Sequence, residues 1–187
     1  MVVFYPTQDA PTAIASQLRL QLLVLLICLA GVTTLRADDL PEYRLKAEYL
    51  YRFAQYTEWP DEVGNTLNLC VHGADPFGAA LDTLQGKTVE RRSIVVMRDV
   101  DADALNSCQI IYVSPGAAAD VPRVIERLRG RPVLIVADTP GAARLGATLN
   151  MAVVNSHVTF EANMQAARMA RINVSSRLLR LATEVIQ

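Results

Sequence analysis

The chain has 187 residues, of which 51% are hydrophobic, and its 18 lysines and arginines against 19 aspartates and glutamates give a formal net charge of -1. This balance argues against nucleic acid or an anionic membrane surface as a partner, because both attract an excess of positive charge. The length suits a single domain with one well-packed core.

The first predicted element is an export signal. Residues 18–32 contain an apolar run after Arg19 that has the length of a signal-peptide core and is too short to span a membrane. Ala37 is a suitable last residue before a cleavage site. We therefore expect residues 1–37 to be a cleaved signal peptide and residues 38–187 to be one exported α/β domain. The alternative is an uncleaved N-terminal anchor.

Export would leave two cysteines, Cys70 and Cys108, in an oxidising compartment, where disulfides persist. A bridge between them would close a loop of about 38 residues and stabilise the fold by about 3–4 kcal/mol. The alternative is two buried free thiols, since cysteine is among the most buried residue types. Cys70 is predicted to lie within a strand and Cys108 just before one, so a bridge depends on the register of the two strands.

A helix is predicted to begin at Pro41, after the capping residues Asp38 and Asp39, and to end before Pro60.

The segment that contains this helix is rich in aromatic side chains. They are Tyr43, Tyr49, Tyr51, Phe53, Tyr56 and Trp59. Three of them share one helical face while Tyr51 points elsewhere, so not all can be buried together. Tyrosine and tryptophan with a polar edge in water are favoured binding anchors, which makes Tyr51 and Trp59 candidates for contact with a protein partner. The alternative is that the aromatic residues form the core under the helix.

Residues 66–136 alternate short apolar runs with amphipathic segments. Strands are predicted over 66–72, 93–97, 109–113 and 132–136, and helices over 76–84 and 119–128. Such alternation is typical of a mostly parallel sheet with helices on both faces. The predicted fold class is therefore α/β.

The pattern changes in the C-terminal part. Residues 147–163 contain two strands with a turn at 155–156, which indicates an antiparallel hairpin. Asn163 can cap a short helix, and Ser175 can cap a second helix over 176–186. The predicted architecture thus ends in a hairpin followed by terminal helices.

The stretch NLCVHGADPFGAALD, residues 68–82, resembles a strand, a glycine turn and a helix start of the kind that holds phosphate groups. A dinucleotide fingerprint needs three glycines, however, and only Gly73 and Gly78 are present. Asp75 would place a negative charge where the phosphate would lie, and it is better explained as a helix cap. Asp99, at the end of the second strand, keeps open the alternative of a small-molecule or nucleotide sensor that binds near Gly73 and Asp99.

No catalytic constellation emerges from the sequence. His72 and His157 have no cysteine, histidine or carboxylate at metal-ligand spacing, and no nucleophile-elbow motif is present. We therefore expect no catalytic residues, no metal and no cofactor, and the chain is predicted not to be an enzyme.

Four arginines near the C-terminus form a second candidate surface. They are Arg168, Arg171, Arg177 and Arg180. Such a set can steer an acidic protein partner by complementary charge. The alternative is an ordinary solvated face.

Five segments, taken together in order and spacing, resemble the YfiR family of periplasmic proteins. They are RLKAEYLYRFAQYTEWP, LNLCVHGADPFGAALDTLQGK, CQIIYVS, RPVLIVAD and VTFEANMQAARMARINVSSRLLRLA. The resemblance covers residues 41–182, and the first and last segments are the most specific.

The resemblance implies a repressor rather than an enzyme. Proteins of this family bind the periplasmic sensory domain of an inner-membrane diguanylate cyclase of the YfiN type and keep it inactive. An outer-membrane, OmpA-like lipoprotein of the YfiB type sequesters the repressor, which raises cyclic-di-GMP and promotes exopolysaccharide and biofilm formation. A homodimer would suit the surplus of aromatic side chains.

The resemblance also assigns roles to particular residues. Cys70 and Cys108 match the cysteine pair of the family, and Glu161 and Asn163 match its FExN segment, which we expect at a partner surface.

Overall fold

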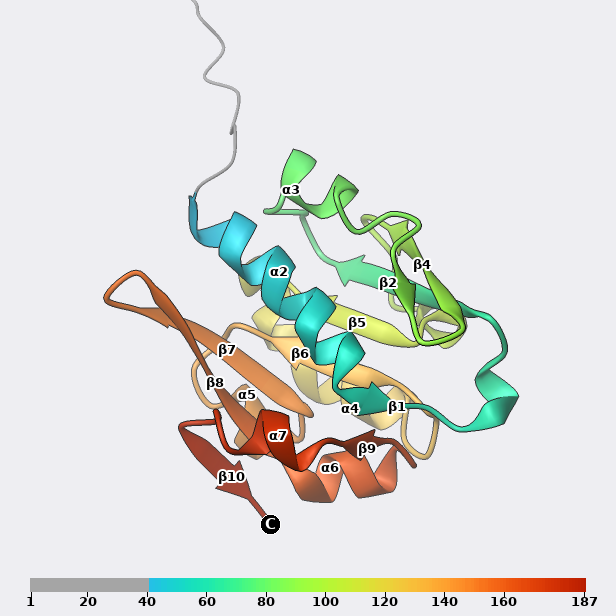
Figure 1. The fold of residues 1–187 in the computed structure, drawn as a ribbon. Helices are drawn as coiled ribbons and strands as arrows, with labels where there is room; N and C mark the ends of the chain where they lie inside the picture. Colours follow the sequence, from blue (N-terminus) through green and yellow to red (C-terminus); the bar gives the residue numbers. More distant parts are fainter. Residues whose placement is uncertain (1–40) are drawn as a thin grey trace, which may run out of the picture. The chain divides into compact units, whose positions relative to one another are not determined.

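Helices and strands alternate along the part of the chain that the computed structural model describes, residues 41–187 (Figure 1). The strands are β1 (Thr57–Glu58), β2 (Thr66–His72), β3 (Thr88–Val89), β4 (Arg92–Met97), β5 (Ile110–Val113), β6 (Leu134–Ala137), β7 (Leu149–Val154), β8 (His157–Asn163), β9 (Asn173–Val174) and β10 (Glu184–Ile186). The α-helices are α2 (Pro41–Gln55), α3 (Ala79–Asp82), α4 (Val121–Arg127), α5 (Ala142–Leu145), α6 (Met164–Met169) and α7 (Ser176–Leu179). The 3-10 helices are η1 (Asp61–Val63), η2 (Leu105–Ser107) and η3 (Pro115–Asp120). The expected signal peptide, 1–37, and the expected caps Asp38 and Asp39 lie outside the described residues.

Eight strands form one sheet in the order β10-β8-β7-β6-β5-β2-β4-β3. Neighbouring strands run parallel except for β3 with β4 and β7 with β8, which are antiparallel. β1 and β9 form a separate antiparallel pair. The predicted mostly parallel sheet with a C-terminal antiparallel hairpin is confirmed.

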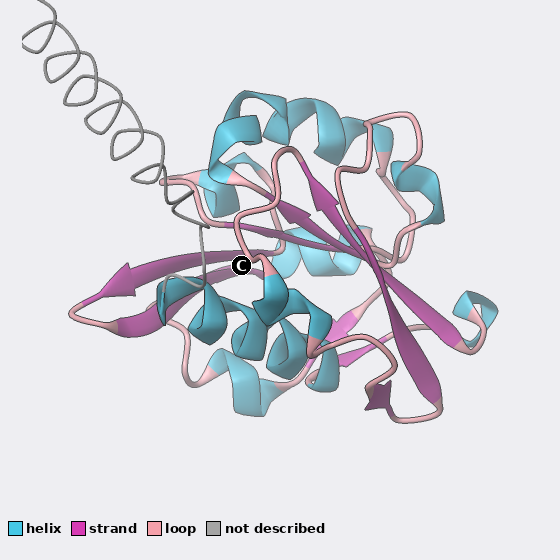
Figure 2. Cartoon of the chain, turned by 90° about the horizontal axis from the view of Figure 1, so that it is seen from above, coloured by secondary structure: helices cyan, strands magenta, loops and turns pink. Residues whose placement is uncertain are grey.

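Helices cover both faces of the sheet (Figure 2). On one face, α2 and α3 pack on a core that includes Phe53, Phe77 and Tyr112. On the other face, α4 and the segments around η2 and η3 pack on Ile111 and Ile135. All residues of β5 and β6 are buried, which explains why these strands read as continuous apolar runs instead of alternating ones.

The predicted disulfide between Cys70 and Cys108 is confirmed, with the two Cα atoms 6.0 Å apart. Cys70 lies within β2, and Cys108 lies just before β5, the strand next to β2 in the sheet. The bridge is compatible with the sheet because these two strands are direct neighbours. Both cysteines are buried.

The prediction of a helix over 176–186 is wrong beyond Leu179. Residues 184–186 form the strand β10, which pairs parallel with β8. The apolar spacing fits a helix locally, but β-branched Val185 and Ile186 instead form ladder hydrogen bonds on an open sheet edge. The local spacing of apolar residues cannot reveal that edge, because α6, β9 and α7 separate β8 from β10 along the chain.

The predicted helix over 76–84 is shorter than expected, and the proposed cap is wrong. α3 begins after Gly78, whereas Asp75 accepts a hydrogen bond from the Phe77 N–H at 2.8 Å and pairs with Arg98. Asp75 therefore stabilises the turn before the helix. The predicted caps Asn163 and Ser175 are confirmed, since their side chains accept hydrogen bonds from Ala166 N–H and Arg177 N–H.

Candidate functional site

A hollow of about 420 Å³ opens at the carboxyl end of β6, between the first turn of α2, the loop after β6 and the β7–β8 hairpin. It is lined by Glu42, Lys46, Asp138, Pro140, Gly141, Asn150, Met151, Ala152, Val153, Thr159, Phe160, Glu161 and Thr183. Open α/β sheets bind ligands at the carboxyl ends of their strands, so this position makes it a candidate site. We call it the carboxyl-end hollow.

The hollow exists because β6 and β7 separate. β7 pairs with β6 only at Leu149 and Asn150. After Ala137 the chain turns away through Gly141, whose φ of 82° favours glycine, while β7 continues to Val154. The edge of β7 beyond Asn150 therefore borders the hollow.

Lys46 is a buried lysine on α2, with 5% of its side chain exposed. Its Nζ donates hydrogen bonds to the carboxylates of Glu42 and Asp138. It also lies 4.6 Å from the centroid of the Tyr43 ring. Burial acts to lower the pKa of Lys46, but the hydrogen bonds to Asp138 and Glu42 outweigh burial and raise the pKa, so the ammonium is charged at neutral pH.

Asp138 joins α2 to the sheet. Its Oδ2 accepts hydrogen bonds from Lys46 and, at 2.7 Å, from the Tyr112 hydroxyl. Burial, together with the negative charge of Asp138, raises the pKa of Tyr112, which keeps this hydroxyl protonated as a donor. Only 2% of the Asp138 side chain is exposed, and among residues 41–187 its Oδ1 has no hydrogen-bond partner.

A second polar pair lies on the hairpin. Asn150 Nδ2 donates to Glu161 Oε2 at 3.0 Å, and Asn150 Oδ1 accepts from the Thr139 N–H at 3.2 Å. Among the charged side chains that line the hollow, three are carboxylates, those of Glu42, Asp138 and Glu161, and one is an ammonium. The carboxyl-end hollow is therefore acidic and favours a cationic group.

The crevice near Gly73 and Asp99 has a different character. Its volume is about 250 Å³, and its lining includes His72, Asp99 and Asp101. A Cβ at Gly73 would lie 2.5 Å from Ser114 Oγ, so the turn after β2 is packed directly against the chain that follows β5. The two carboxylates and this close packing disfavour the phosphate groups of a nucleotide.

Two of the residues predicted to contact a partner are buried, and the expectation that they lie on a surface is wrong. Trp59 and Asn163 are each 6% exposed. Trp59 belongs to the core beneath α2. Asn163 caps α6 and donates a hydrogen bond to the Ala143 carbonyl, so its polar atoms are used within the fold.

The other predicted residues lie in separate places. Glu161 lines the carboxyl-end hollow. Tyr51, on α2, donates a hydrogen bond to the Thr88 carbonyl, and the Lys87 ammonium lies over its ring. Arg171 forms an ion pair with Glu62 at 3.0 Å, whereas Arg168 is exposed on α6. The fold therefore does not gather these residues into one site.

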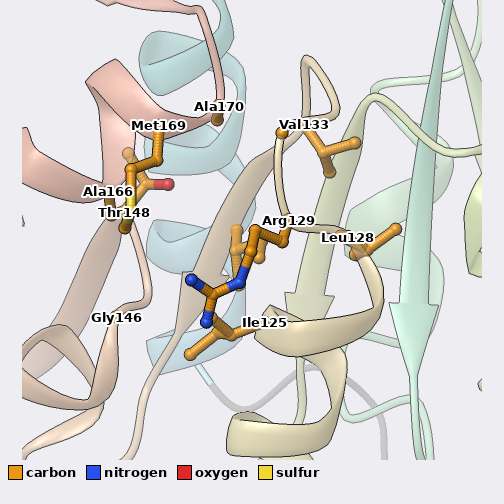
Figure 3. A pocket seen from close by; sticks show the side chains of 11 residues that line it. Ile125, Leu128, Arg129, Val133, Gly146, Thr148, Ala166, Met169 and Ala170 are labelled. Atoms are coloured by element: carbon orange, nitrogen blue, oxygen red, sulfur yellow. The ribbon is translucent and has the colours of Figure 1, made fainter.

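A small apolar notch lies beside α6 (Figure 3). It is lined by Ile125, Leu128, Arg129, Gly130, Val133, Ile135, Gly146, Thr148, Ala166, Met169 and Ala170. Its volume of about 40 Å³ leaves room for little more than one small group. Met169, at its rim, is 44% exposed and follows Arg168 on α6. This is an apolar spot next to an exposed arginine.

Sequence reasoning missed Lys46, Asp138 and Asn150. Lys46 shares a helical face with the buried Leu50 and Phe53, and a lysine on an apolar face was the available signal. Asp138 directly follows the apolar run of β6, which is where carboxyl-end groups lie.

None of the helices in residues 41–187 has the length and hydrophobicity that a transmembrane span requires. Within the same residues, no group of three or more histidine, cysteine or carboxylate side chains is arranged to hold a metal ion.

The fold and the hollow define an α/β domain with a mostly parallel sheet and a candidate binding site at the carboxyl end of β6. The family model described as YfiR/HmsC-like matches residues 43–183, and the chain belongs to this family.

Two solved structures share the fold. One is a conserved domain protein from Vibrio cholerae O1 biovar El Tor, with a TM-score of 0.50 and 10% identity over 76% of this chain. The other is an ABC domain in complex with L-Trp from Streptococcus pneumoniae, with a TM-score of 0.52 and 10% identity over 78% of this chain. The chain spans 60% of the length of each. At this identity the likeness concerns the fold alone.

Proposed function

We propose that the protein is a periplasmic repressor that binds the periplasmic sensory domain of an inner-membrane diguanylate cyclase and holds it inactive. The observation that carries this proposal is the YfiR/HmsC-like match over residues 43–183. Residues 1–37 would be the cleaved export signal, and residues 38–187 the mature domain.

The polar groups of the carboxyl-end hollow support binding rather than a chemical reaction. Lys46 is engaged by two carboxylates, and Asn150 is engaged by Glu161 and the Thr139 N–H. A catalytic base or nucleophile needs a reactive group aimed at substrate, whereas these groups hold one another. We therefore propose that the protein is not an enzyme.

Binding alone is sufficient for repression. If the protein binds only the inactive conformer of the cyclase, it shifts the population by the difference in its affinity for the two conformers. A difference of about 5.5 kcal/mol would move the equilibrium from 1:99 to 99:1.

Sequestration by an outer-membrane, OmpA-like lipoprotein would relieve the repression. The exposed surface of α6, with Arg168, Met169 and the apolar notch, suits an acidic partner that inserts one small apolar group. A homodimer is a further proposal, and light scattering on the exported domain, alone and with the cyclase's periplasmic domain, tests it.

Deletion of the gene tests the proposed function in cells. We expect higher cyclic-di-GMP and more biofilm than in the parent strain, and restoration of both by the wild-type gene. Unchanged cyclic-di-GMP after deletion would contradict a repressor role.

Charge reversal tests the partner surface. Glu161→Arg should weaken binding to the cyclase's periplasmic domain at least about tenfold. The reason is that the half-buried carboxylate, which attracts a cationic group of the partner, is replaced by a positive charge that repels it. Glu48→Arg is the matched control, since Glu48 is an exposed carboxylate on α2 away from the hollow lining. Equal affinity of the two variants in a pull-down and by titration calorimetry would remove Glu161 from the binding surface.

A second candidate function is a small-molecule sensor. The carboxyl-end hollow has the volume of a small ligand site, and one protein of the same fold was solved in complex with L-Trp. A thermal-shift screen with amino acids and nucleotides tests this candidate, and an unchanged melting temperature with every compound would exclude those ligands.

A further inference from the structure

The outer half of the β7–β8 hairpin has a free edge. The β6–β7 ladder ends at Asn150, whereas the β7–β8 ladder continues to Val154 and His157. Among residues 41–187, no strand other than β8 pairs with residues 151–154. Figures 1 and 2 show this part of the hairpin extending beyond the rest of the sheet.

The backbone groups on this edge can be assigned. The Asn163 N–H donates to the Thr148 carbonyl at 2.8 Å, so residues 148 and 163 form a hydrogen-bonded pair of the antiparallel ladder. Hydrogen-bonded and non-hydrogen-bonded pairs alternate along such a ladder. The pair of Met151 with Phe160 is then of the second kind, and the Phe160 carbonyl agrees, because it points away from β7 to accept from the Thr183 N–H at 2.8 Å.

It follows that the N–H and C=O groups of Met151 and Val153 point away from β8, towards the free edge. The groups of Ala152 and Val154 point inwards and pair with β8. Two donors and two acceptors are thus spaced along β7 as a further strand would need them. Val153 is half-buried and Met151 is buried, so an added strand reaches Met151 only by entering the carboxyl-end hollow that both residues line.

This edge borders the acidic carboxyl-end hollow. Met151, Ala152 and Val153 line the hollow together with the carboxylates of Glu42 and Glu161. Asp138 lines it too, and this almost fully buried side chain has an oxygen without a hydrogen-bond partner among the described residues. A strand on β7 would therefore place one of its side chains next to an excess of negative charge.

We propose that the free edge of β7 binds an extended segment of the partner protein as an added strand, with a lysine or arginine side chain of that segment in the carboxyl-end hollow. Main-chain hydrogen bonds to Met151 and Val153 would give affinity, and the acidic hollow would select the cationic side chain. This inference rests on the proposed function, because it assigns a contact with the cyclase's periplasmic domain.

The charge favours a different protein over a second copy of this chain as the occupant. In a symmetric pair formed through β7, each copy presents the same patch to the other. Two acidic hollows would then lie along one interface, and like charges in an interface are unfavourable. A basic extended segment has the complementary charge.

Amide hydrogen exchange measured by NMR tests the proposal without any variant. On addition of the cyclase's periplasmic domain, the amides of Met151 and Val153 should exchange at least about tenfold more slowly, which corresponds to about 1.4 kcal/mol. The amides of Ala152 and Val154 are the internal control, since they already pair with β8. Binding without protection of Met151 and Val153 would overturn the proposal, whereas absence of any binding would contradict the proposed function itself.

Val153→Pro provides a second test. Proline removes an outward-facing donor and obstructs an added strand, but an edge position tolerates it. Binding should weaken at least about tenfold, while Val153→Ala, which keeps the N–H, should bind like the wild type. The melting temperature shows whether the proline variant is folded, and a folded variant with wild-type affinity would overturn the proposal.

The charge component has its own test. The double variant Glu42→Gln, Glu161→Gln should lose at least about fivefold in affinity, and the loss should shrink at high salt because the contact is electrostatic. Unchanged affinity would overturn the assignment of a cationic side chain to the hollow. A β7-dependent dimer in light scattering, lost in Val153→Pro, would assign the edge to a second copy instead.

Discussion

Two crevices lie at the carboxyl ends of parallel strands in this protein, and they differ in how they are filled. The crevice near Gly73 and Asp99 lies after β2 and β4, and on its β5 side it is bounded by direct packing, because the Ser114 N–H donates to the His72 carbonyl and Ala117 lies against Gly73. The carboxyl-end hollow beside β6 and β7 is open and lined by paired charges. The first is architecture, and the second is a candidate for binding.

The difference shows that strand order alone does not make a binding site. β2 and β5 stay paired up to His72 and Val113, so the chain after them meets at once and fills the space. β6 and β7 pair over only two residues and then separate. An opening therefore forms where neighbouring strands diverge. The polar side chains that line it form hydrogen bonds with one another, as buried polar groups must.

The largest expected effect on stability concerns the carboxyl-end hollow. Lys46→Met should lower the free energy of unfolding by about 3–5 kcal/mol, because it leaves the buried Asp138 carboxylate without its cation. Chemical denaturation measures the loss. Lys87→Met is the control, because Lys87 is exposed, and its stability should stay near that of the wild type. A stable Lys46→Met protein would mean that Asp138 does not need the ammonium.

The disulfide tests how firmly β2 and β5 are held together. Replacing both Cys70 and Cys108 by serine should lower the free energy of unfolding by about 3 kcal/mol, because the bridge ties β2 to the start of β5. The melting temperature of the wild type with reducing agent should fall by a comparable amount. If reduction leaves it unchanged, the pairing of β2 with β5 is held by packing and backbone hydrogen bonds without a contribution from the bridge.

Gly73→Ala tests the packing itself. The added Cβ would lie 2.5 Å from Ser114 Oγ and 2.7 Å from Ala117 Cβ, at a φ of 85°. We expect a loss of about 2–3 kcal/mol from crowding and backbone strain. Gly130→Ala has a similar φ of 75° and nothing within 4 Å of its Cβ, so it should lose only about 1 kcal/mol. Equal losses would show that strain, and not close approach, requires Gly73.

The smallest expected effect is a pH dependence of stability that arises from the contact of Tyr112 with Asp138 beside the carboxyl-end hollow. The pKa of Tyr112 is raised by burial and by Asp138, so above pH 10 the unfolded chain releases the proton while the folded chain retains it. Stability should then fall as the pH rises, by at most about 1.4 kcal/mol per pH unit from this one group. Tyr112→Phe should show a shallower fall in alkaline denaturation curves, and parallel curves would contradict the assignment.

Much of the fold could be predicted because its signals are local. Apolar runs such as β5 and β6, the hairpin with its turn at Asn155, and the cap at Asn163 each depend on a few neighbouring residues. Exposure could not be predicted in the same way. The Trp59 ring could lie in water or in the core, and only its packing under α2 decides.

The candidate site was predicted only in part. Glu161 was named from the family resemblance, but Lys46 and Asp138 are far apart in the chain and have no shared motif. Their contact depends on how α2 crosses the sheet. β10 was missed for a similar reason. The apolar spacing of residues 184–186 fits a helix, but these residues pair with the open edge of β8 instead.

The sequence by itself determined the α/β class, the hairpin and the cysteine pair, since hydrophobic periodicity and turn residues act over short distances. Only the tertiary structure decided that β6 and β7 separate, that three carboxylates and one buried ammonium line the same hollow, and that an edge of β7 stays unpaired. These features depend on contacts between distant segments, which local patterns do not encode.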